Sequence, residues 1–433
     1  MASWVEVKED SDFSLRNLPY GVFSISGSKP PRIGTAIGDY VLDMNVLAVD
    51  GVFEDIGFDV ATLGETTLNS YAALGKDVHS KVRERVQGLL EKETKLGSLL
   101  RDNQDRRARA LVPMSSVQMH LPMIIGDYTD FFIGLHHAVT CANVLKPGAK
   151  IEQLCPCFYN LPVAYNGRAS SVVVSGTPFH RPRGQIPVGG EIVSGPCRKL
   201  DFEVEFACLI GKGNEMGHEI KVDQAEEHIF GFVLMNDWSA RDIQFYEASM
   251  MGPFNGKSFC TSVSPWVVPL EALEPFRTPP SQTPRPLADY LTEKEATSAY
   301  NIPIKATLEA RSERYEIATC NTSNVIFSFA QMLAHHTRGG CPLRTGDLVA
   351  TGTLSGPTKA EAGCFFEQSR GGTEPSELKA SGTGRGSVQR AFLEDNDAVE
   401  FSAQASLGDG LGNVGFGVCS GRVLPALQFF KKM

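Results

Sequence analysis

The stretch LDFEVEF, residues 200–206, alternates acidic and apolar side chains along its whole length. Asp201, Glu203 and Glu205 occupy every second position, and phenylalanine or valine stands between them. Because successive side chains of a β-strand point to opposite faces, the pattern predicts that the three carboxylates share one face. Neighbouring carboxylates repel one another, and a buried carboxylate without a partner is very costly. The function of these three carboxylates therefore depends on which groups lie opposite their face of the strand.

The composition is that of an ordinary globular protein. The 433 residues are 42% hydrophobic and 21% charged, which is ample for a large core. A formal net charge of -9, without an evident basic face, argues against a nucleic-acid partner. The longest apolar runs, such as IFGFVLM at 229–235, are too short to span a bilayer. We therefore expect a protein that binds neither membrane nor nucleic acid.

The termini and the cysteines indicate the compartment. The first residues, MASWVEVKED, lack the basic and apolar regions of a secretory signal, and the final FKKM does not match a peroxisomal address. The ten cysteines are scattered and contain no C-x-x-C. We expect reduced thiols in a cytoplasmic protein.

The chain divides by its pattern into two parts. Residues 1–118 show short strand patterns separated by glycine and proline, then a helical stretch at about 67–90. From residue 119 onward strand patterns dominate without regular alternation with helices, which favours a β-rich α+β fold over a doubly wound sheet. The proline-rich segment 274–287 and the glycine-rich segment 363–386 are predicted as long loops.

Oxygen ligands without cysteine or histidine select Ca²⁺, Mg²⁺ or Mn²⁺. A divalent ion opposite Glu203 and Glu205 would cancel their repulsion, whereas Asp201 stands at the start of the strand and is interpreted as structural. The alternative is that each acid is a solvated strand or turn residue. Two further stretches combine acids with other polar side chains, GDYTDFFIGLHHA at 126–138 and NDWSARDIQ at 236–244.

Two other motifs carry less weight. GLGNVGFG at 410–417 matches G-x-G-x-x-G, but no helix or suitably placed acid follows it, so a strand–turn–strand is predicted. His335 and His336 precede Gly339 and are interpreted as the C-terminal end of a helix.

Several long stretches together resemble the fumarylacetoacetate hydrolase family over essentially the whole length of the chain. They are DSDFSLRNLPYGVFS, GDYTDF, GRASSVVVSGTP, EHIFGFVLMNDWSARDIQ, DLVATGTLSGP and GFGVCSGRVLPAL. The resemblance implies a small N-terminal SH3-like barrel over residues 1–118, a mixed β-roll catalytic domain over 119–433, and a homodimer.

The resemblance also implies the site residues. The family's Ca²⁺ ligands match Asp130, Glu203, Glu205 and Asp237, whereas Asp127 matches a nearby acid that is not a ligand. A second, Mg²⁺-associated site matches Asp237, Lys257 and Thr261. The family's catalytic base matches His137, and the acid that orients the base matches Glu367. The position in the sequence alone does not distinguish His137 from the adjacent His136. Groups that hold the substrate and the developing oxyanion match Arg241, Gln244 and Lys257, and further substrate contacts match Tyr165 and Thr353.

Three substrate-contacting positions depart from the family pattern. Phe132 and Ala248 stand where the family has tyrosine, and Lys146 stands where it has arginine. Asn166 also replaces a histidine. Lysine is a point charge where arginine offers a planar fork, and two hydroxyl donors are lost. We therefore expect the affinity for the substrate, or the acyl group that the pocket accepts, to differ from that of the family.

The activity implied by the resemblance is metal-dependent hydrolysis of the carbon–carbon bond of 4-fumarylacetoacetate to fumarate and acetoacetate. That reaction is the last step of tyrosine and phenylalanine catabolism, and Ca²⁺ and Mg²⁺ are the expected cofactors. The altered positions leave open a hydrolase of acylpyruvates or other 1,3-diketo acids. A metal-dependent decarboxylase or isomerase, and a non-catalytic Ca²⁺-binding structural dimer, are the remaining alternatives.

Overall fold

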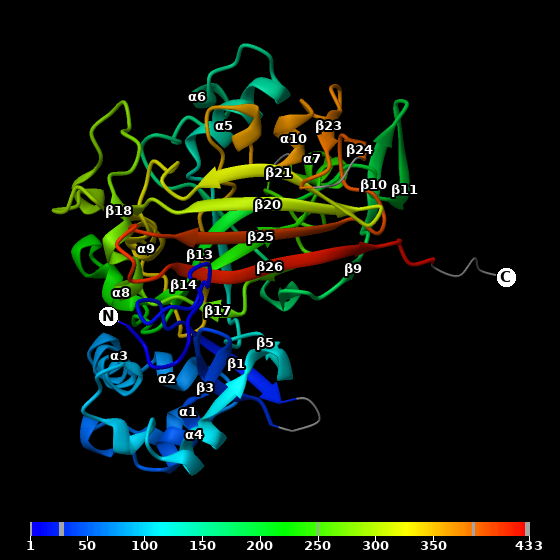
Figure 1. Ribbon diagram of the computed structural model, residues 1–433. Coiled ribbons are helices and arrows are strands. Elements are labelled where there is room, and N and C mark those ends of the chain that lie inside the picture. The colour runs from blue at the N-terminus through cyan, green and yellow to red at the C-terminus, as the bar shows by residue number, and fades with distance from the viewer. Residues whose placement is uncertain (1, 26–29, 249–250, 383–385, 429–433) are drawn as a thin grey trace.

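The computed structural model describes residues 2–25, 30–248, 251–382 and 386–428 (Figure 1). The N-terminal part lies below the larger remainder of the molecule in this view, and long strands cross the upper part. Among the described residues, no helix is long and apolar enough to cross a membrane.

An N-terminal sheet contains short strands near the start of the chain, as the strand patterns of residues 1–118 predict. Its described strands are β1 (Tyr20–Ile25), β2 (Arg32–Ile37), β3 (Tyr40–Asp43), β4 (Leu111–Pro113), β5 (Val117–His120) and β17 (Trp266–Val267). β17 comes from the C-terminal part of the chain and pairs with β1. The two parts of the chain therefore share this sheet.

The helices of the N-terminal part differ from the single helical stretch that the sequence predicted. They are α1 (Met44–Val49), α2 (Asn69–Ala72), α3 (Lys76–Leu90) and α4 (Gln104–Ala110). The single helical stretch predicted at about 67–90 is wrong, since it breaks before α3 at Gly75, whose φ of 89° lies in the left-handed region. α3 buries Val82, Val86 and Leu89.

A mixed sheet forms the centre of the molecule. Its described strands follow the spatial order β7 (Ala164–Asn166), β6 (Tyr128–Phe131), β22 (Leu348–Ala350), β13 (Val204–Ile210), β14 (Ile229–Asp237), β16 (Thr261–Val263) and β8 (Val172–Val174). β6 runs parallel to β22 and β8 parallel to β16, and the other neighbours are antiparallel. The absence of regular strand–helix alternation in the sequence is thus reflected in a mixed, β-rich architecture.

β13 is buried on both faces. Val204, Phe206 and Cys208 face a core shared with a second large sheet, whereas Ala207 and Leu209 face a core shared with the N-terminal part. The ring of Phe206 stacks on Phe232, with centroids 5.2 Å apart. Any acid on this strand is therefore held inside the protein.

The second large sheet and the smaller elements complete the upper part of the molecule. The second sheet has the order β21 (Glu313–Asn321), β20 (Pro303–Ala310), β25 (Ala398–Ala405), β26 (Val414–Leu424) and β9 (Phe179–His180). The two-stranded pairs are β10 (Arg183–Val188) with β11 (Glu191–Pro196), β12 (Leu200–Asp201) with β15 (Ser239–Ala240), β18 (Arg277–Thr278) with β19 (Ala299–Tyr300), and β23 (Ser376–Lys379) with β24 (Ser387–Arg390). The helices are α5 (Leu135–Leu145), α6 (Ile151–Leu154), α7 (Arg241–Glu247), α8 (Leu270–Leu273), α9 (Phe329–Thr337) and α10 (Phe365–Gln368).

Two predictions about motifs are confirmed. The glycine-rich stretch 410–417 runs from the turn after β25 into β26, as a strand–turn–strand. His335 and His336 lie in the last turn of α9.

Two further sequence predictions are wrong. LDFEVEF is not one continuous strand, because Phe202 and Glu203 separate β12 from β13. Segment 363–386 is not only loop, since it contains α10 and β23, although its residues 383–385 lie outside the described residues. Burial of Phe365 and Phe366 in the core stabilises α10, and the glycine content of the segment hid this short helix.

Candidate active site

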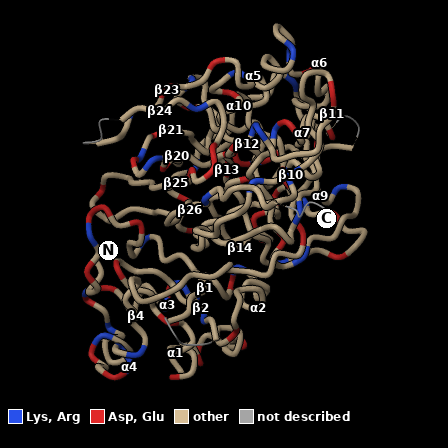
Figure 2. Tube along the Cα trace, turned by 90° about the vertical axis from the view of Figure 1, so that its right-hand side faces the viewer, with Lys and Arg blue, Asp and Glu red and all other residues tan. Residues whose placement is uncertain are grey.

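Three carboxylates from neighbouring strands meet in the interior of the central sheet. Asp130 lies on β6, Glu205 on β13 and Asp237 at the end of β14, and all three are buried. One carboxylate oxygen of each lies within 4.8 Å of the others. We call these three residues the acid cluster. Figure 2 shows charged segments gathered where β12, β13 and α7 lie together.

The acid cluster contains carboxylate oxygens without partners, although its member Asp237 is paired with Lys257 Nζ. Both oxygens of Glu205 and Oδ1 of Asp130 are buried without a hydrogen-bond partner among the described residues. Burial, followed by the neighbouring carboxylates, raises the pKa of Glu205 and of Asp130 well above the ordinary value. Unpartnered buried carboxylates fit an oxygen-coordinated divalent cation, which is the ion class that this donor set selects.

Both carboxylate oxygens of Asp237 accept hydrogen bonds from other side chains. Its Oδ2 accepts a hydrogen bond from the Tyr165 hydroxyl at 2.8 Å and one from Lys257 Nζ. Its Oδ1 accepts from Thr261 Oγ1 at 3.1 Å. The structure thus brings together all the residues that the sequence associated with a second, Mg²⁺ site.

Glu203 lies between two cations. Its Oε1 is 2.8 Å from Arg241 Nη1, and its Oε2 is paired with Lys257 Nζ. Burial alone would raise the pKa of Glu203, but the charges of Arg241 and Lys257 hold it below its usual range. Lys257 also bonds Asp237, so Glu203 adjoins the acid cluster through the shared ammonium group.

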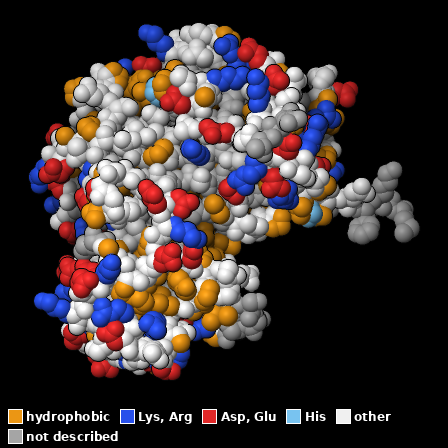
Figure 3. Space-filling view, viewed as in Figure 1, with side chains coloured by type: hydrophobic (Ala, Val, Ile, Leu, Met, Phe, Trp, Pro, Cys, Tyr) orange, Lys and Arg blue, Asp and Glu red, His pale blue; other side chains and the backbone are white. Residues whose placement is uncertain are grey.

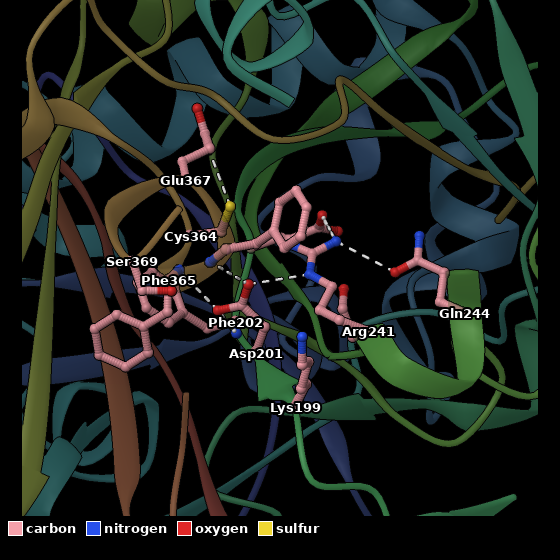
Figure 4. A network of polar contacts seen from close by, with 12 residues as sticks. Lys199, Asp201, Phe202, Arg241, Gln244, Cys364, Phe365, Glu367 and Ser369 are labelled. Carbon is pink, nitrogen blue, oxygen red and sulfur yellow. Dashed lines mark hydrogen bonds and ion pairs between the residues drawn. The ribbon is translucent and has the colours of Figure 1, made fainter. Parts of the chain in front are cut away.

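Asp201 faces a different set of donors, as Figure 4 shows. Its Oδ2 accepts from Arg241 Nε at 3.0 Å and from the backbone N–H of Phe366 at 2.9 Å. Its Oδ1 accepts from the backbone N–H of Phe365 at 2.8 Å and of Phe202 at 3.0 Å. Asp201 therefore joins Arg241 to the first turn of α10.

His137 and Glu367 form a buried pair where α5 meets α10. Nδ1 of His137 lies 2.7 Å from Oε2 of Glu367. The same oxygen accepts from Ser355 Oγ at 2.8 Å and from the Cys364 thiol at 3.1 Å. The carboxylate is thus fixed from three sides, and Nε2 of His137 remains on the other side of the ring.

The two charges of this pair stabilise each other. Burial would lower the pKa of His137, but Cys141 and Glu367 raise it well above its ordinary value. Burial would raise the pKa of Glu367, but His137 and the hydrogen bonds of Cys364 and Ser355 lower it. Glu367 is therefore the ionised orienting group, and His137 is the member of the pair that takes up a proton.

Arg241 offers a donor that is not yet used. Its Nε bonds Asp201, and its Nη1 lies 3.3 Å from the amide oxygen of Gln244. Its Nη2 is buried without a partner among the residues that the structure describes. A buried, unpaired guanidinium N–H is suited to bind an oxygen of a ligand.

The remaining predicted substrate residues differ in their burial, and of them the ring contacts place Phe132 against His137. The ring of Phe132 meets the His137 imidazole edge-on, with centroids 5.4 Å apart. Thr353 is buried, and its carbonyl would lie only 2.3 Å from a Cβ at Gly134, just before α5. Ala248 is half-buried at the end of α7, whereas Lys146 is exposed at the end of α5.

Two residues of the stretch 126–138, Asp127 and His136, differ in burial from the site residues of the same stretch. Asp127 is exposed, and its backbone N–H donates to Asp347, so its side chain lies outside the acid cluster. His136 is only half-buried, while His137 is buried and paired with Glu367. The structure therefore distinguishes two histidines that the sequence pattern alone did not.

Sequence reasoning missed three residues that contact the His137–Glu367 pair. Ser355 and Cys364 donate to Glu367, and Cys141 lies against the imidazole. A signal existed for one of them. Cys141 follows His137 by four positions, a spacing that places side chains on one face of a helix, whereas Cys364 lies in the segment that was predicted as a loop.

Comparison with known proteins identifies the family. The model described as Fumarylacetoacetate (FAA) hydrolase C-terminal matches residues 148–423, and Fumarylacetoacetase N-terminal matches residues 16–122. A fumarylacetoacetase of Emericella nidulans is 46% identical over 442 residues, covering 99% of each chain. Those of Arabidopsis thaliana and Homo sapiens are each 44% identical, covering 98% of this chain and 99% of each relative.

A solved structure supports the fold. Fumarylacetoacetate hydrolase from psychrophilic Exiguobacterium antarcticum is 17% identical and has a TM-score of 0.50, covering 94% of this chain and 99% of that one. The family matches and the full-length relatives together show that this chain belongs to the fumarylacetoacetate hydrolase family.

Proposed function

We propose that this protein is a hydrolase that cleaves the carbon–carbon bond of 4-fumarylacetoacetate to give fumarate and acetoacetate. The observation that carries the proposal is the combination of a buried His137–Glu367 pair with a buried acid cluster in which neither oxygen of Glu205 has a hydrogen-bond partner among the described residues. The full-length relatives named fumarylacetoacetase support the choice of substrate. The reaction would stand at the end of tyrosine and phenylalanine catabolism.

His137 is proposed as the general base that takes a proton from the attacking water. Glu367 holds Nδ1 at 2.7 Å, which leaves Nε2 to accept that proton. Ser355 and Cys364 keep the carboxylate in place. A positioned base of this kind commonly contributes about 10²- to 10⁴-fold in rate.

Arg241, Gln244 and Lys257 are proposed to bind the oxyanion that forms when water adds to the carbonyl. Nη2 of Arg241 is a donor already inside the protein without a partner among the described residues. Burial would lower the pKa of Lys257, but Asp237 and Glu203 raise it, so the ammonium group stays protonated. Each such donor is commonly worth about 3 to 4 kcal/mol in the transition state.

The acid cluster with Glu203 is proposed to hold Ca²⁺, and Asp237, Lys257 and Thr261 are proposed to form a Mg²⁺-associated site. When bound, a divalent cation would polarise the substrate's adjacent oxygens and oppose the protonated form of His137. Tyr165, Thr353, Phe132, Lys146 and Ala248 are proposed to line the substrate pocket.

The architecture and assembly are also proposals. We propose an SH3-like barrel over residues 1–118, a catalytic β-roll over 119–433, a homodimer and a cytoplasmic location. The N-terminal family match at 16–122 supports the first unit. Hydrophobic side chains gather over the N-terminal part in Figure 3, and the partly buried Val117 and Met119 belong to β5 of its sheet. This surface supports assembly with a second copy.

The test is hydrolysis of fumarylacetoacetate, followed by loss of its ultraviolet absorbance and by detection of both products. The matched pair of variants is His137→Asn and His136→Asn. We expect the first to lose about 10²-fold or more of the rate and the second to retain it, since only His137 is paired with Glu367. Equal losses in both variants would overturn the assignment of the base.

Hydrolysis of an acylpyruvate is the second candidate. Phe132, Lys146 and Ala248 motivate it because they change the positions expected to hold the substrate's carboxylate end. A substrate panel separates the two reactions. Preference for fumarylacetoacetate removes the second candidate, and preference for an acylpyruvate replaces the first. Metal binding with no turnover on either would favour a structural dimer.

A further inference from the structure

Cys155 and Cys157 form a pair of thiols at the end of α6. Their Sγ atoms lie 3.8 Å apart, and one proline separates the two residues in the chain. No other two thiols among the described residues lie within hydrogen-bonding distance of each other. Both side chains are half-buried, so each is partly open to solvent. The proposed hydrolysis by His137 and Glu367 makes no use of this pair.

A backbone turn brings the two thiols together. The Cys155 N–H donates to the Ile151 carbonyl at 2.8 Å, where α6 ends. The Phe158 N–H donates to the Cys155 carbonyl at 3.1 Å and closes a turn over residues 155–158. Pro156 suits the second position of such a turn, because proline fixes φ near about -65°. The backbone therefore favours the close approach of the two sulfurs.

The spacing of the pair is compatible with a bond between the sulfurs. Two residues separated by one other span at most about 7 Å of fully extended chain, and a turn shortens that span. Disulfides join Cα atoms that are about 4.4 to 6.8 Å apart. The sulfurs must approach from 3.8 Å to about 2.0 Å, which requires side-chain rotation and a small movement of the turn. The two cysteines are therefore close enough for an internal disulfide.

The two thiols also influence each other's ionisation. Burial, followed by the charge of Cys157, raises the pKa of Cys155 to about 11. A thiolate on one sulfur thus lies next to a thiol that retains its proton. In thiol–disulfide exchange, a thiolate attacks the reagent and a neighbouring thiol then resolves the mixed disulfide. The pair contains both of these groups.

Aromatic packing joins the turn to the candidate active site. Phe158, which follows Cys157, is 1% exposed and belongs to the large core. Its ring centroid lies 5.9 Å from that of Phe132, whose own ring meets the His137 imidazole edge-on. α6 lies beside α5, the helix that carries His137 (Figure 1). A movement of the turn therefore displaces a ring that packs against the neighbour of the proposed base.

We propose that Cys155 and Cys157 are a reversible dithiol–disulfide site, whose oxidation moves Phe158 and alters substrate binding. The oxidant is a low-molecular-weight disulfide of the glutathione class. Disulfides in reducing compartments are usually transient and catalytic or redox-sensing, which fits a half-buried pair better than a structural bond. The effect on substrate binding rests on the proposed function, whereas formation of the disulfide does not.

The exchange balances in atoms and electrons. The thiolate of one cysteine attacks a sulfur of the reagent, the S–S bond of the reagent breaks, and one reagent thiolate leaves. The second cysteine loses its proton and attacks the sulfur of the first, and the other reagent thiolate leaves. The two cysteines lose two electrons, the reagent disulfide gains them, and the two thiol protons pass to the released thiolates.

The test equilibrates the full-length protein with mixtures of reduced and oxidised glutathione, followed by acid quenching and peptide mass spectrometry. We expect the peptide with both cysteines to lose two hydrogen atoms and to carry no glutathione. Exposed Cys341, whose thiol bonds the Pro342 carbonyl, should instead carry glutathione. The equilibrium constant for the internal disulfide should be at least about tenfold larger in the folded than in the urea-unfolded protein, because the turn holds the sulfurs together.

Cys155→Ser and Cys157→Ser are the matched variants, since each leaves one cysteine of the pair. The remaining cysteine should then carry glutathione, as the trapped intermediate of the exchange. Two results would overturn the disulfide site. One is glutathione on the wild-type pair in place of an internal disulfide, and the other is an equilibrium constant no larger than that of the unfolded chain.

KM for fumarylacetoacetate, measured on the reduced and the fully oxidised protein, tests the link to the pocket. We expect KM to change by at least about threefold, since small displacements beside a reacting group alter binding and rate. Dithiothreitol should reverse the change, and the variant with both serines should not show it. An unchanged KM would overturn the link. Absence of hydrolysis in the reduced protein would count against the proposed function alone, because mass spectrometry detects the disulfide without turnover.

Discussion

The two ends of LDFEVEF place buried carboxylates in opposite electrostatic settings. Asp201 accepts hydrogen bonds from Arg241 and from backbone N–H groups at the start of α10. Glu205, four residues later, has no hydrogen-bond partner for either oxygen within the described ranges. Both side chains are fully buried. One carboxylate is already satisfied by the protein, and the other lacks the positive charge that it needs.

The difference shows what decides the role of a buried acid. Strand parity brings an acid to one face, but the elements packed against that face supply or withhold its partners. α7 and α10 supply them at Asp201, whereas β6 and β14 bring further acids to Glu205. The comparison predicts that substitutions at the two ends have separable effects on metal affinity and on stability.

Glu205→Gln should have the largest effect. It removes a ligand charge from the acid cluster, so we expect metal affinity to fall by more than about a hundredfold and hydrolysis to fall with it. Stability without metal should hold or rise, because a repelling buried carboxylate is removed. Calorimetric titration with Ca²⁺ and urea unfolding measure the two effects. Exposed Glu191→Gln is the control, and a metal affinity equal to that of the control would refute the prediction.

Asp201→Asn should show the converse pattern. It removes one of the two ion pairs of buried Arg241, which keeps Glu203, and weakens the link to α10, so the free energy of unfolding should fall by about 1.5 to 3 kcal/mol. Metal affinity should change far less than in Glu205→Gln. Urea unfolding in the presence of chelator measures the loss. A change below about 0.5 kcal/mol would show that the Asp201 contacts contribute little.

The pH dependence of the metal-free protein sharpens the comparison further. The folded-state pKa values of Asp130 and Glu205 are raised above the ordinary value near 4. Their favourable contribution is therefore complete below about pH 4 and is lost as pH rises through the raised values. A bound cation prevents this loss, so stabilisation by Ca²⁺ should grow with pH. At a hundred times Kd it amounts to about 2.7 kcal/mol.

Urea unfolding with Ca²⁺ and with chelator, repeated across the pH range, measures this difference directly. Contributions of distant groups cancel between the two conditions. A Ca²⁺ stabilisation that does not depend on pH would mean that Asp130 and Glu205 are not the groups whose charge the ion compensates.

Phe132→Tyr should have the smallest effect. It restores a hydroxyl beside His137, at a position where the family has tyrosine, and the neighbouring ring geometry is kept. We expect KM for fumarylacetoacetate to fall by up to about tenfold, as one added hydrogen bond allows, with the melting temperature unchanged. Steady-state kinetics give the answer, and a higher KM would indicate that this pocket is shaped for another acyl group.

The strand patterns predicted the strand-rich fold, and the resemblance named most residues of the candidate site. Alternation marked β13, and the family motifs marked Glu203, Glu205 and His137. The pairing of Arg241 with Asp201 spans forty positions and follows only from the packing of α7 beside β12. Ser355 was missed for a similar reason, since its contact with Glu367 depends on where an irregular segment folds back.

The central claim is that buried acids in this protein hold a divalent ion required for carbon–carbon bond hydrolysis. The most direct measurement is the rate of fumarylacetoacetate loss against free Ca²⁺ or Mg²⁺ for wild type and Glu205→Gln, starting from chelated protein. The account predicts no turnover without metal, saturation by one of these ions in the wild type, and little recovery in the variant. Full activity of the chelated wild type, or equal metal responses in both proteins, would contradict it.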